Sequence, residues 1–256
     1  MKGNILINIV VPMAGLGSRF VDAGFVTPKP FIDVLGEPMI MRVLENLKYP
    51  NARYLLLIRS EHMEQEKLAI DRIKDKYNVT FVPVSKVTEG TASTVLLAEN
   101  YIDNKTPLVV ANSDQIVDVC FSDFVDDCFH RKLDGSILTF KDESRDPKWS
   151  FARIDSDGFV LEVREKVAIS EYATVGIYMY NKGSDFVDKA RLMICNNDRV
   201  NGEFYTCPVY NYIIDNNQKV GIYNILESEM HGLGTPLDLQ AYIDLHNNKS
   251  LSSQDL

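Results

Sequence analysis

A short apolar run that leads directly into a glycine turn is the feature that most constrains the fold of this chain. Residues 5–11, ILINIVV, are followed by Pro12 and the turn Met13-Ala14-Gly15-Leu16-Gly17-Ser18. A nearly unbroken apolar run of this length is typical of a strand covered on both faces in a parallel sheet. Glycines behind such a strand let backbone N–H groups approach an anion. The segment therefore predicts an α/β fold with an anion-binding turn.

The turn matches neither of the common nucleotide-binding glycine motifs. Phe20 stands where a G-x-G-x-x-G dinucleotide fingerprint has its last glycine, and the chain has no G-x-x-x-x-G-K-[ST] loop. Arg19 lies in the turn, and Lys29 is held between Pro28 and Pro30, which restrict the local backbone. Two cations beside neutral backbone donors suit a polyphosphate. The alternative is a glycine-rich connection with two solvated cations.

Further apolar runs recur along the chain, with helical patterns between them. Strands are predicted at residues 54–58, 79–84 and 107–111, and a helix from the spacing of Met39, Val43 and Leu47. After about residue 140, the Asp157-Gly158 turn predicts a hairpin. Further strands are expected at 173–180 and 219–226, helices at 184–194, 203–215 and 236–246, and a frayed tail at 247–256. This order predicts a single domain over residues 1–256, a Rossmann-like three-layer α/β/α fold with a mostly parallel mixed sheet.

Composition excludes several classes of partner. The chain has 27 basic and 36 acidic residues, a net charge of -9, which disfavours nucleic acid and anionic membranes. An anionic substrate would need a local basic pocket. The four cysteines have no metal-ligand spacing with one another or with the histidines, so neither zinc nor disulfides are expected. The chain begins without a cleavage site and has no apolar run of about 18 residues, which predicts a reducing, cytoplasmic setting.

Several motifs, taken together, carry a family resemblance. "GLGSRF" followed by "TPKP" resembles the signature of the nucleotidyltransferases that make nucleoside-diphosphate sugars, the sugar-phosphate pyrophosphorylases. The similarity continues in order through "EGTASTVLLA", "NSDQIVD", "VREK", "TVGIYMY", "NGEFYTCPVYN" and "GLGTPLDL". The resemblance implies a nucleotide-binding half at about residues 1–140 and an acceptor-binding half, with added β structure, at about 141–250.

The resemblance also implies a role for each matching residue. The implied catalytic residues are Arg19, Lys29 and Lys166, and Asp114 is the implied ligand of Mg²⁺. The nucleotide would be bound by Met13, Ala14, Gly15, Leu16, Gly17, Ser18, Gly90, Thr91 and Ser113. The acceptor would be bound by Arg164, Glu165, Gly176 and Glu203.

Physical reasoning about single residues leaves alternatives open. Asp114 follows an apolar strand, where α/β sheets place their ligands, but it could instead cap the helix expected near Ser122 or form an Asx turn. Thr91 could simply cap the helix that follows it. Glu203 would also be favourable in the first turn of a helix, whatever its function.

The strand-like residues 159–166 yield two further expectations. Strict alternation places Arg164 and Lys166 on one face and Glu165 on the other, with Leu161 and Val163. The alternative for the two cations is a solvated strand face. Because Glu165 ends an apolar face, we expect it to be hydrogen-bonded to backbone or to a basic residue near the site.

One position departs from the family pattern. Many relatives have an aspartate two residues before the closing G-T dipeptide as a second metal ligand, whereas this chain has Gly232. Water, Asp238 or another acid could take its place.

The resemblance implies nucleotidyl transfer: the phosphate of an acceptor attacks the α-phosphorus of a nucleoside triphosphate, and pyrophosphate leaves. The chain is most similar to small bacterial capsule-cluster cytidylyltransferases, including those that act on phosphoglutamine, which favours CTP and capsule-precursor synthesis. The alternatives are a dTTP- or UTP-dependent hexose-1-phosphate nucleotidyltransferase, a glycosyltransferase, or a catalytically silent nucleotide-binding module. Small relatives are often dimers, so a homodimer is a further expectation.

Overall fold

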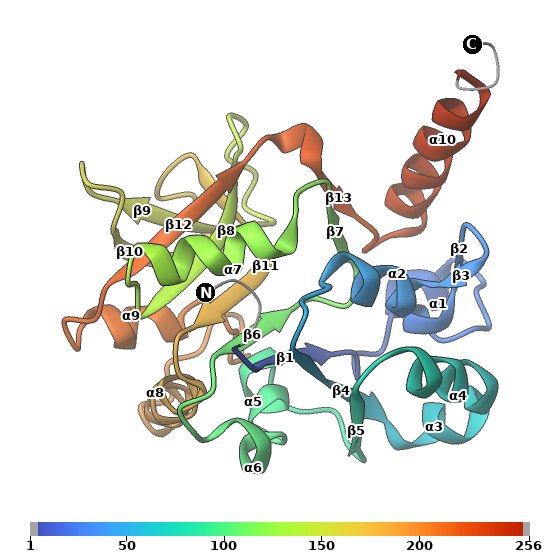
Figure 1. Ribbon diagram of the computed structural model, residues 1–256, viewed down its shortest axis with the longest axis horizontal. Helices are drawn as coiled ribbons and strands as arrows, with labels where there is room; N and C mark the ends of the chain where they lie inside the picture. Colours follow the sequence, from blue (N-terminus) through green and yellow to red (C-terminus); the bar gives the residue numbers. More distant parts are fainter. Residues whose placement is uncertain (1–4, 253–256) are drawn as a thin grey trace.

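The computed structural model describes residues 5–252, with side chains described as far as residue 247. A nine-stranded sheet runs through the molecule in the order β10-β9-β11-β6-β1-β4-β5, with β8 beside β11 and β12 beside β8 (Figure 1). The strands are β1 (Ile7–Pro12), β4 (Ala52–Arg59), β5 (Val79–Val84), β6 (Leu108–Ala111), β8 (Gly135–Lys141), β9 (Ser150–Ile154), β10 (Val160–Glu165), β11 (Tyr172–Tyr180) and β12 (Val220–Ile225). Two short sheets pair β2 (Asp33–Val34) with β3 (Glu37–Pro38) and β7 (Gln115–Val117) with β13 (Met230–Gly232).

Helices cover both faces of the large sheet. They are α1 (Ser18–Asp22), α2 (Met39–Asn46), α3 (Ser60–Gln65), α4 (Lys67–Lys76), α5 (Thr91–Leu96), α6 (Glu99–Ile102), α7 (Phe121–His130), α8 (Gly183–Cys195), α9 (Val209–Ile214) and α10 (Pro236–Ser252). One apolar core contains side chains of α2, α4 and α7, and the other contains side chains of α5, α8 and α9. This confirms the predicted three-layer α/β/α arrangement.

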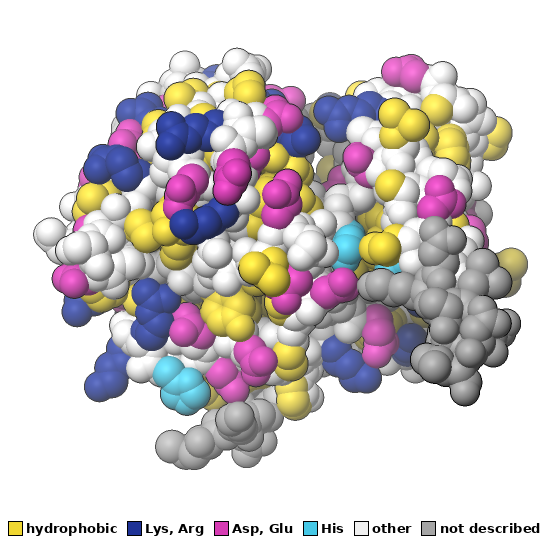
Figure 2. Space-filling view, turned by 90° about the horizontal axis from the view of Figure 1, so that it is seen from above, with side chains coloured by type: hydrophobic (Ala, Val, Ile, Leu, Met, Phe, Trp, Pro, Cys, Tyr) yellow, Lys and Arg dark blue, Asp and Glu magenta, His cyan; other side chains and the backbone are white. Residues whose placement is uncertain are grey.

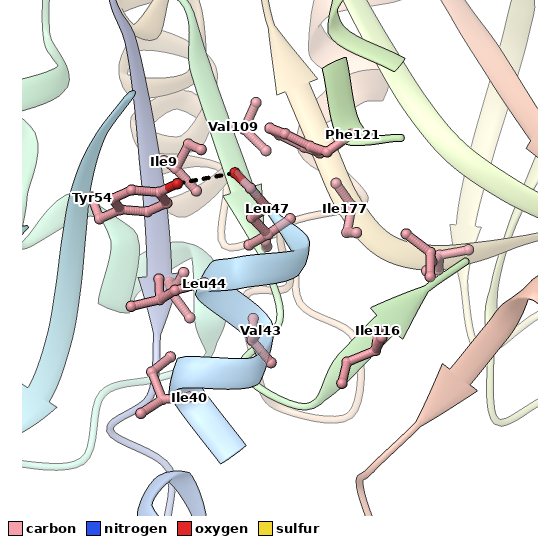
Figure 3. Close-up of a cluster of buried hydrophobic side chains, with 14 of the residues drawn as sticks. Ile9, Ile40, Val43, Leu44, Leu47, Tyr54, Val109, Ile116, Phe121 and Ile177 are labelled. Carbon is pink, nitrogen blue, oxygen red and sulfur yellow. Dashed lines mark hydrogen bonds between the residues drawn. The ribbon is translucent and has the colours of Figure 1, made fainter. Parts of the chain in front are cut away.

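Parallel pairing in the first half follows from the apolar runs. β1 pairs in parallel with β4 on one side and β6 on the other. Residues 7–11 are all buried, as expected for a strand covered on both faces. Figure 3 shows Ile40 and Leu44 of α2 beside β1 and β4, and the Tyr54 hydroxyl donates a hydrogen bond at 3.2 Å to the carbonyl of Leu47, which directly follows α2.

The second half mixes strand directions, as predicted. β11 is antiparallel to both β6 and β8, whereas β12 is parallel to β8. The predicted hairpin is β9–β10, and the Asp155 carboxylate accepts hydrogen bonds from the amides of Asp157 and Phe159 in its turn, both at 2.9 Å. None of the helices formed by residues 5–252 combines the length and the apolarity needed to cross a bilayer.

Two expectations about helix limits are wrong. The helix predicted at 203–215 begins only at Val209, because the backbone of Phe204 is bonded to the segment before α5 and cannot join a helix. The tail predicted to fray from residue 247 continues α10 to Ser252, since no proline or glycine interrupts it; residues 253–256 lie outside the described residues.

Candidate active site

The glycine turn and Lys29 line a cavity of about 340 Å³, here called the donor cavity. The turn connects the end of β1 to the start of α1, and its residues 13–18 all line this cavity. Gly17 has a φ of 62°, and a Cβ atom at this position would lie 3.1 Å from the Lys29 Cβ. Glycine therefore serves both the left-handed backbone and the close approach of Lys29.

Lys29 and Asp114 form the charged centre of the site. The Lys29 ammonium donates to the Asp114 carboxylate in an ion pair that joins segments 85 residues apart. Asp114 follows β6, and its carbonyl accepts a 2.7 Å hydrogen bond from the Leu233 amide. The alternative that Asp114 caps the next helix is wrong, because α7 begins at Phe121, several residues farther on, with Cys120 at its N-cap. Asp114 thus lies at the strand end that the sequence predicted.

The start of α5 adjoins the same cavity. Gly90 has a φ of 117°, and the amide of Ala92 donates to the Phe204 carbonyl at 2.9 Å. The Thr91 hydroxyl accepts a 3.2 Å hydrogen bond from the Thr206 hydroxyl and does not cap the helix, so the capping alternative is wrong. Gly90 and Thr91 line the donor cavity together with Ser113.

A second cavity of about 230 Å³, here called the inner cavity, lies beside β11. Gly176 of β11 has a φ of 90°, and a Cβ atom there would lie 2.2 Å from the Asn112 Nδ2 atom. Gly176 therefore leaves room for the Asn112 side chain, which lines the cavity with Gln115. Gln115 is buried, and its Oε1 atom has no hydrogen-bond partner among the described residues.

Glu165 is a buried carboxyl group in the wall of the inner cavity. Its Oε2 atom accepts a hydrogen bond from the Ser150 hydroxyl. Burial raises the pKa of Glu165 above its usual range, although the Ser150 hydrogen bond and the charge of Lys166 act in the opposite direction. The expectation of a backbone or basic hydrogen-bond partner is therefore wrong: the partner is a hydroxyl group, and the basic residue contributes only through its charge.

The raised pKa of Glu165 predicts a pH-dependent loss of stability. As pH rises above about 4.3, the usual glutamate pKa, the folded state holds this proton more tightly than the unfolded state, so the free energy of unfolding falls. Glu165→Gln has no carboxyl group at this position and therefore avoids the loss. The free energy of unfolding of this variant, relative to that of wild type, should increase as pH rises above the usual glutamate pKa. Urea unfolding between pH 4 and pH 8 measures the difference.

Glu162 of the same strand provides the matched control. Hydrogen bonds from Arg164 and Arg153 lower the pKa of Glu162. Its stabilisation is present above the usual glutamate pKa and is lost as pH falls through the lowered value. Glu162→Gln should therefore lose stability relative to wild type towards neutral pH, opposite in sign to Glu165→Gln. A stability difference for Glu165→Gln that does not change with pH would contradict the prediction.

Lys166 lies directly after β10 and has a partner that the sequence did not indicate. Its backbone is left-handed, with a φ of 56°, and its ammonium donates a 2.8 Å hydrogen bond to the Tyr205 hydroxyl. This hydrogen bond raises the pKa of Lys166. Tyr205 lines the inner cavity, and only its proximity to Glu203 in the "NGEFYTC" motif could have drawn attention to it. Glu203 itself lines the donor cavity and does not begin a helix.

The predicted shared face of Arg164 and Lys166 is wrong. A bulge in β10 between Val160 and Glu162 shifts the alternation, so Leu161 is 45% exposed while Glu165 is buried. The left-handed backbone of Lys166 then ends the strand pattern. The Arg164 guanidinium pairs with Glu162 at 2.6 Å on an exposed surface, outside the donor and inner cavities.

The residues around Asp114 fit a magnesium ion that is held largely by substrate phosphates. Mg²⁺ needs only one or two carboxylates when phosphate oxygens and waters complete its coordination. Among residues 5–247, whose side chains are described, His, Cys, Asp and Glu form no cluster of three or more that could hold a metal. Gly232 pairs with Gln115 between β13 and β7, and Asp238 is bonded to Thr235 at the start of α10. Gly232 therefore supplies no second carboxylate, whereas Asp238 lines the outer groove together with Asp114.

A third and larger hollow of about 880 Å³, here called the outer groove, lies beneath α10. Arg19 and Asp114 line its inner end, and Asn112 and Gln115 are shared with the inner cavity. Figure 2 shows the molecule hollowed between a larger and a smaller mass, with acidic and basic side chains interspersed on the surface. The three spaces thus meet around the end of β6.

Comparison with known proteins identifies the family. The model of the family described as nucleotidyl transferase matches residues 9–220. This chain belongs to the nucleotidyl transferase family. The mannose-1-phosphate guanylyltransferase catalytic subunit beta of Drosophila pseudoobscura pseudoobscura is 30% identical over 179 residues, 67% of this chain and 47% of that protein. The chain spans about half the length of the curated relatives it matches.

Solved structures of other proteins share the fold of this nucleotidyl transferase family member. The nucleoside-diphosphate-sugar pyrophosphorylase from Vibrio cholerae RC9 has a TM-score of 0.81 and 23% identity, covering 92% of this chain and 99% of that one. The inositol-1-phosphate CTP transferase from T. maritima has a TM-score of 0.73 and 14% identity, covering 95% and 98%. At these identities the likeness confirms the Rossmann-like fold and leaves the substrate open.

Proposed function

We propose that this chain transfers a nucleoside monophosphate from a nucleoside triphosphate to the phosphate of a small acceptor and releases pyrophosphate. The Lys29–Asp114 ion pair carries the proposal, since it joins the donor cavity to the outer groove. Family membership supports the same reaction class. The residues that the resemblance marked, apart from Arg164 and Lys166, line these connected spaces, and Lys166 is hydrogen-bonded to Tyr205 in the wall of the inner cavity.

The proposed reaction needs positioning and charge neutralisation more than proton transfer. An oxygen of the acceptor phosphate forms a bond to the α-phosphorus, and the bond to the bridging oxygen breaks, leaving its electron pair on pyrophosphate. Because a phosphate is already ionised at neutral pH, no general base is required. No histidine of the described residues lines the donor or inner cavity, which agrees with this chemistry.

Each charged side chain has a proposed role in this reaction. Lys29 and Arg19 neutralise the charge that develops on pyrophosphate, and Lys166 holds the acceptor phosphate against the triphosphate. Asp114 holds Mg²⁺, which would neutralise charge on the bound triphosphate. The glycine turn supplies backbone N–H donors. Tyr205 fixes the ammonium of Lys166 through their 2.8 Å hydrogen bond.

We propose CTP as the donor, a sugar 1-phosphate or phosphoglutamine-like compound as the acceptor, and capsule-precursor synthesis as the setting. The support is the similarity of "EGTASTVLL" and "NSDQIVD" to small cytidylyltransferases. The named relatives are a guanylyltransferase and, among proteins of the same fold, a CTP transferase. Because these proteins use different nucleotides, they do not identify the donor of this chain. The division into nucleotide-binding and acceptor-binding halves and the homodimer belong to the same proposal.

Release of pyrophosphate tests the reaction directly. The purified chain is incubated with Mg²⁺, each of CTP, UTP, dTTP, ATP and GTP, and a panel of sugar 1-phosphates, phosphocholine and phosphoglutamine. We expect acceptor-dependent release with CTP. Release with dTTP or UTP alone would support nucleotidyl transfer but contradict CTP as the donor. Triphosphate binding without turnover would support a silent module, and sugar transfer without pyrophosphate release would support a glycosyltransferase.

A further inference from the structure

The inner cavity and the outer groove share one aromatic wall. Trp149, the single tryptophan of the chain, lines both spaces, as does its neighbour Lys148. Ligand pockets for small molecules usually measure about 300–1,000 Å³. The inner cavity, at about 230 Å³, is below this range, whereas the outer groove, at about 880 Å³, is within it. A ligand in the inner cavity therefore has space to extend past Trp149.

Trp149 is fixed in place by its neighbours. Its ring meets Phe140 edge to face at 5.4 Å, and the Lys148 ammonium lies 4.9 Å from the centre of the ring. The Trp149 carbonyl accepts a 3.1 Å hydrogen bond from the amide of Lys166. The ring therefore has a defined position relative to the cation that we place at the acceptor phosphate.

The outer groove combines apolar side chains with charged ones, and the charged residues that line it are Arg19, Asp114, Asp142, Lys148, Glu227 and Asp238. Ala241 and Leu245 of α10 and Met230 of β13 line it. Two of its carboxylates are bonded within the protein, since Asp142 accepts from the Ser144 and Asp146 amides and Asp238 accepts from the Thr235 hydroxyl at 2.7 Å. Lys148 likewise pairs with Asp146 at 3.1 Å. The ring of Trp149 and the apolar side chains of the groove suit a neutral group with an apolar C–H face.

We propose that the acceptor is larger than one phosphorylated sugar: its phosphorylated ring binds at the inner cavity, and a second neutral ring packs across Trp149 in the outer groove. Aromatic side chains favour such partners because they combine large apolar area with defined geometry. Trp149 then selects the acceptor by its length. This inference rests on the proposed nucleotidyl transfer and goes beyond it by specifying the size and charge of the acceptor.

The test compares acceptors that differ only in the second ring. Glucose 1-phosphate is paired with maltose 1-phosphate, and mannose 1-phosphate with mannobiose 1-phosphate, in the pyrophosphate assay with saturating triphosphate. In at least one pair we expect the two-ring acceptor to have a kcat/KM up to about tenfold higher, chiefly through KM, as expected for one aromatic contact. The two-ring acceptor should also change the emission of Trp149 more than its one-ring counterpart.

Two variants of Trp149 and one control variant show whether Trp149 selects the acceptor or only supports the fold. Trp149→Ala should abolish the two-ring preference, and Trp149→Phe should retain part of it. Phe159→Ala is the matched control, because the Phe159 ring also packs against the core, lies 5.7 Å from the Lys219 ammonium and lines none of these three spaces. Phe159→Ala should keep the preference of wild type.

The outcomes distinguish this inference from the proposed function. Pyrophosphate release without a two-ring preference in either pair, or a preference that survives Trp149→Ala, would overturn the inference and leave nucleotidyl transfer standing. No release with any acceptor of the wider panel, despite bound triphosphate, would overturn both.

Discussion

Replacement of Lys29 with alanine should lower the turnover number for pyrophosphate release by about 10²-fold or more, on the scale of losing one electrostatic stabiliser. The side chain lies at the meeting point of the donor cavity and the outer groove, where its charge would face the leaving pyrophosphate. It is also mostly buried, with 18% of the side chain exposed, so water cannot fully replace its charge. Steady-state kinetics on acceptor and triphosphate provide the measurement.

The control for Lys29 must remove a lysine without affecting the site. Lys48 pairs with Glu45 at 3.3 Å beside α2 and is 73% exposed. Lys48→Ala should change turnover little, because exposed ion pairs contribute at most about 1 kcal/mol to stability. Near-normal turnover of a folded Lys29→Ala protein would refute the catalytic role of Lys29.

The direct pairing of Lys29 with Asp114 makes their contributions dependent on each other. Asp114→Asn should also lower turnover by about 10²-fold, because the proposed metal ligand is lost. Residues that act as one unit show strongly non-additive effects. The double variant Lys29→Ala with Asp114→Asn should therefore be much less impaired than the product of the two single effects. Additive losses would indicate that the two side chains act separately.

The parts of the site that could be predicted from sequence follow from local rules. Nearly unbroken apolar runs indicated the parallel strands, and the ends of β1 and β6 then placed the glycine turn and Asp114 at one edge. Lys29 was identified by its flanking prolines and by the family signature, and the structure brings it to Asp114. These features depend on residues close in sequence and on the regular geometry of a sheet.

The features that could not be predicted depend on packing between distant segments. The left-handed backbone of Lys166 takes its side chain off the face of Arg164, and sequence alternation does not reveal such a turn. The contact of Tyr205 with Lys166 joins residues 39 positions apart. Trp149 becomes a candidate acceptor-binding residue only when the inner cavity and the outer groove, both of which it lines, are known.

The glycine at position 90 should be among the least replaceable residues of the site. Its φ of 117° and ψ of 174° belong to a region that is almost restricted to glycine, which costs other residues about 1–3 kcal/mol. A Cβ atom would also lie 2.5 Å from the Phe204 carbonyl oxygen and 2.6 Å from its amide nitrogen. Overpacking of this kind adds about 1–3 kcal/mol. Gly90→Ala should therefore lower the free energy of unfolding by roughly 2–6 kcal/mol.

A glycine elsewhere separates the two contributions. Gly24 has a φ of 86°, but a Cβ atom there would meet nothing within 4 Å. Gly24→Ala should therefore show only the cost of the backbone conformation, about 1–2 kcal/mol. Urea unfolding of both variants gives the comparison. Equal losses would show that the contact with Phe204 relaxes without cost.

The same clash should weaken the binding of both the triphosphate and the acceptor, because Phe204 connects the two halves of the site. Its amide donates to the Glu89 carbonyl at 2.7 Å, and its carbonyl accepts from the Ala92 amide at 2.9 Å. Thr91, next to Gly90, lines both the donor cavity and the inner cavity. A displacement of α5 from Phe204 must therefore change both spaces. Gly90→Ala, assayed where it remains folded, should raise the KM for triphosphate and for acceptor, whereas a change confined to one of them would show that the two spaces are mechanically independent.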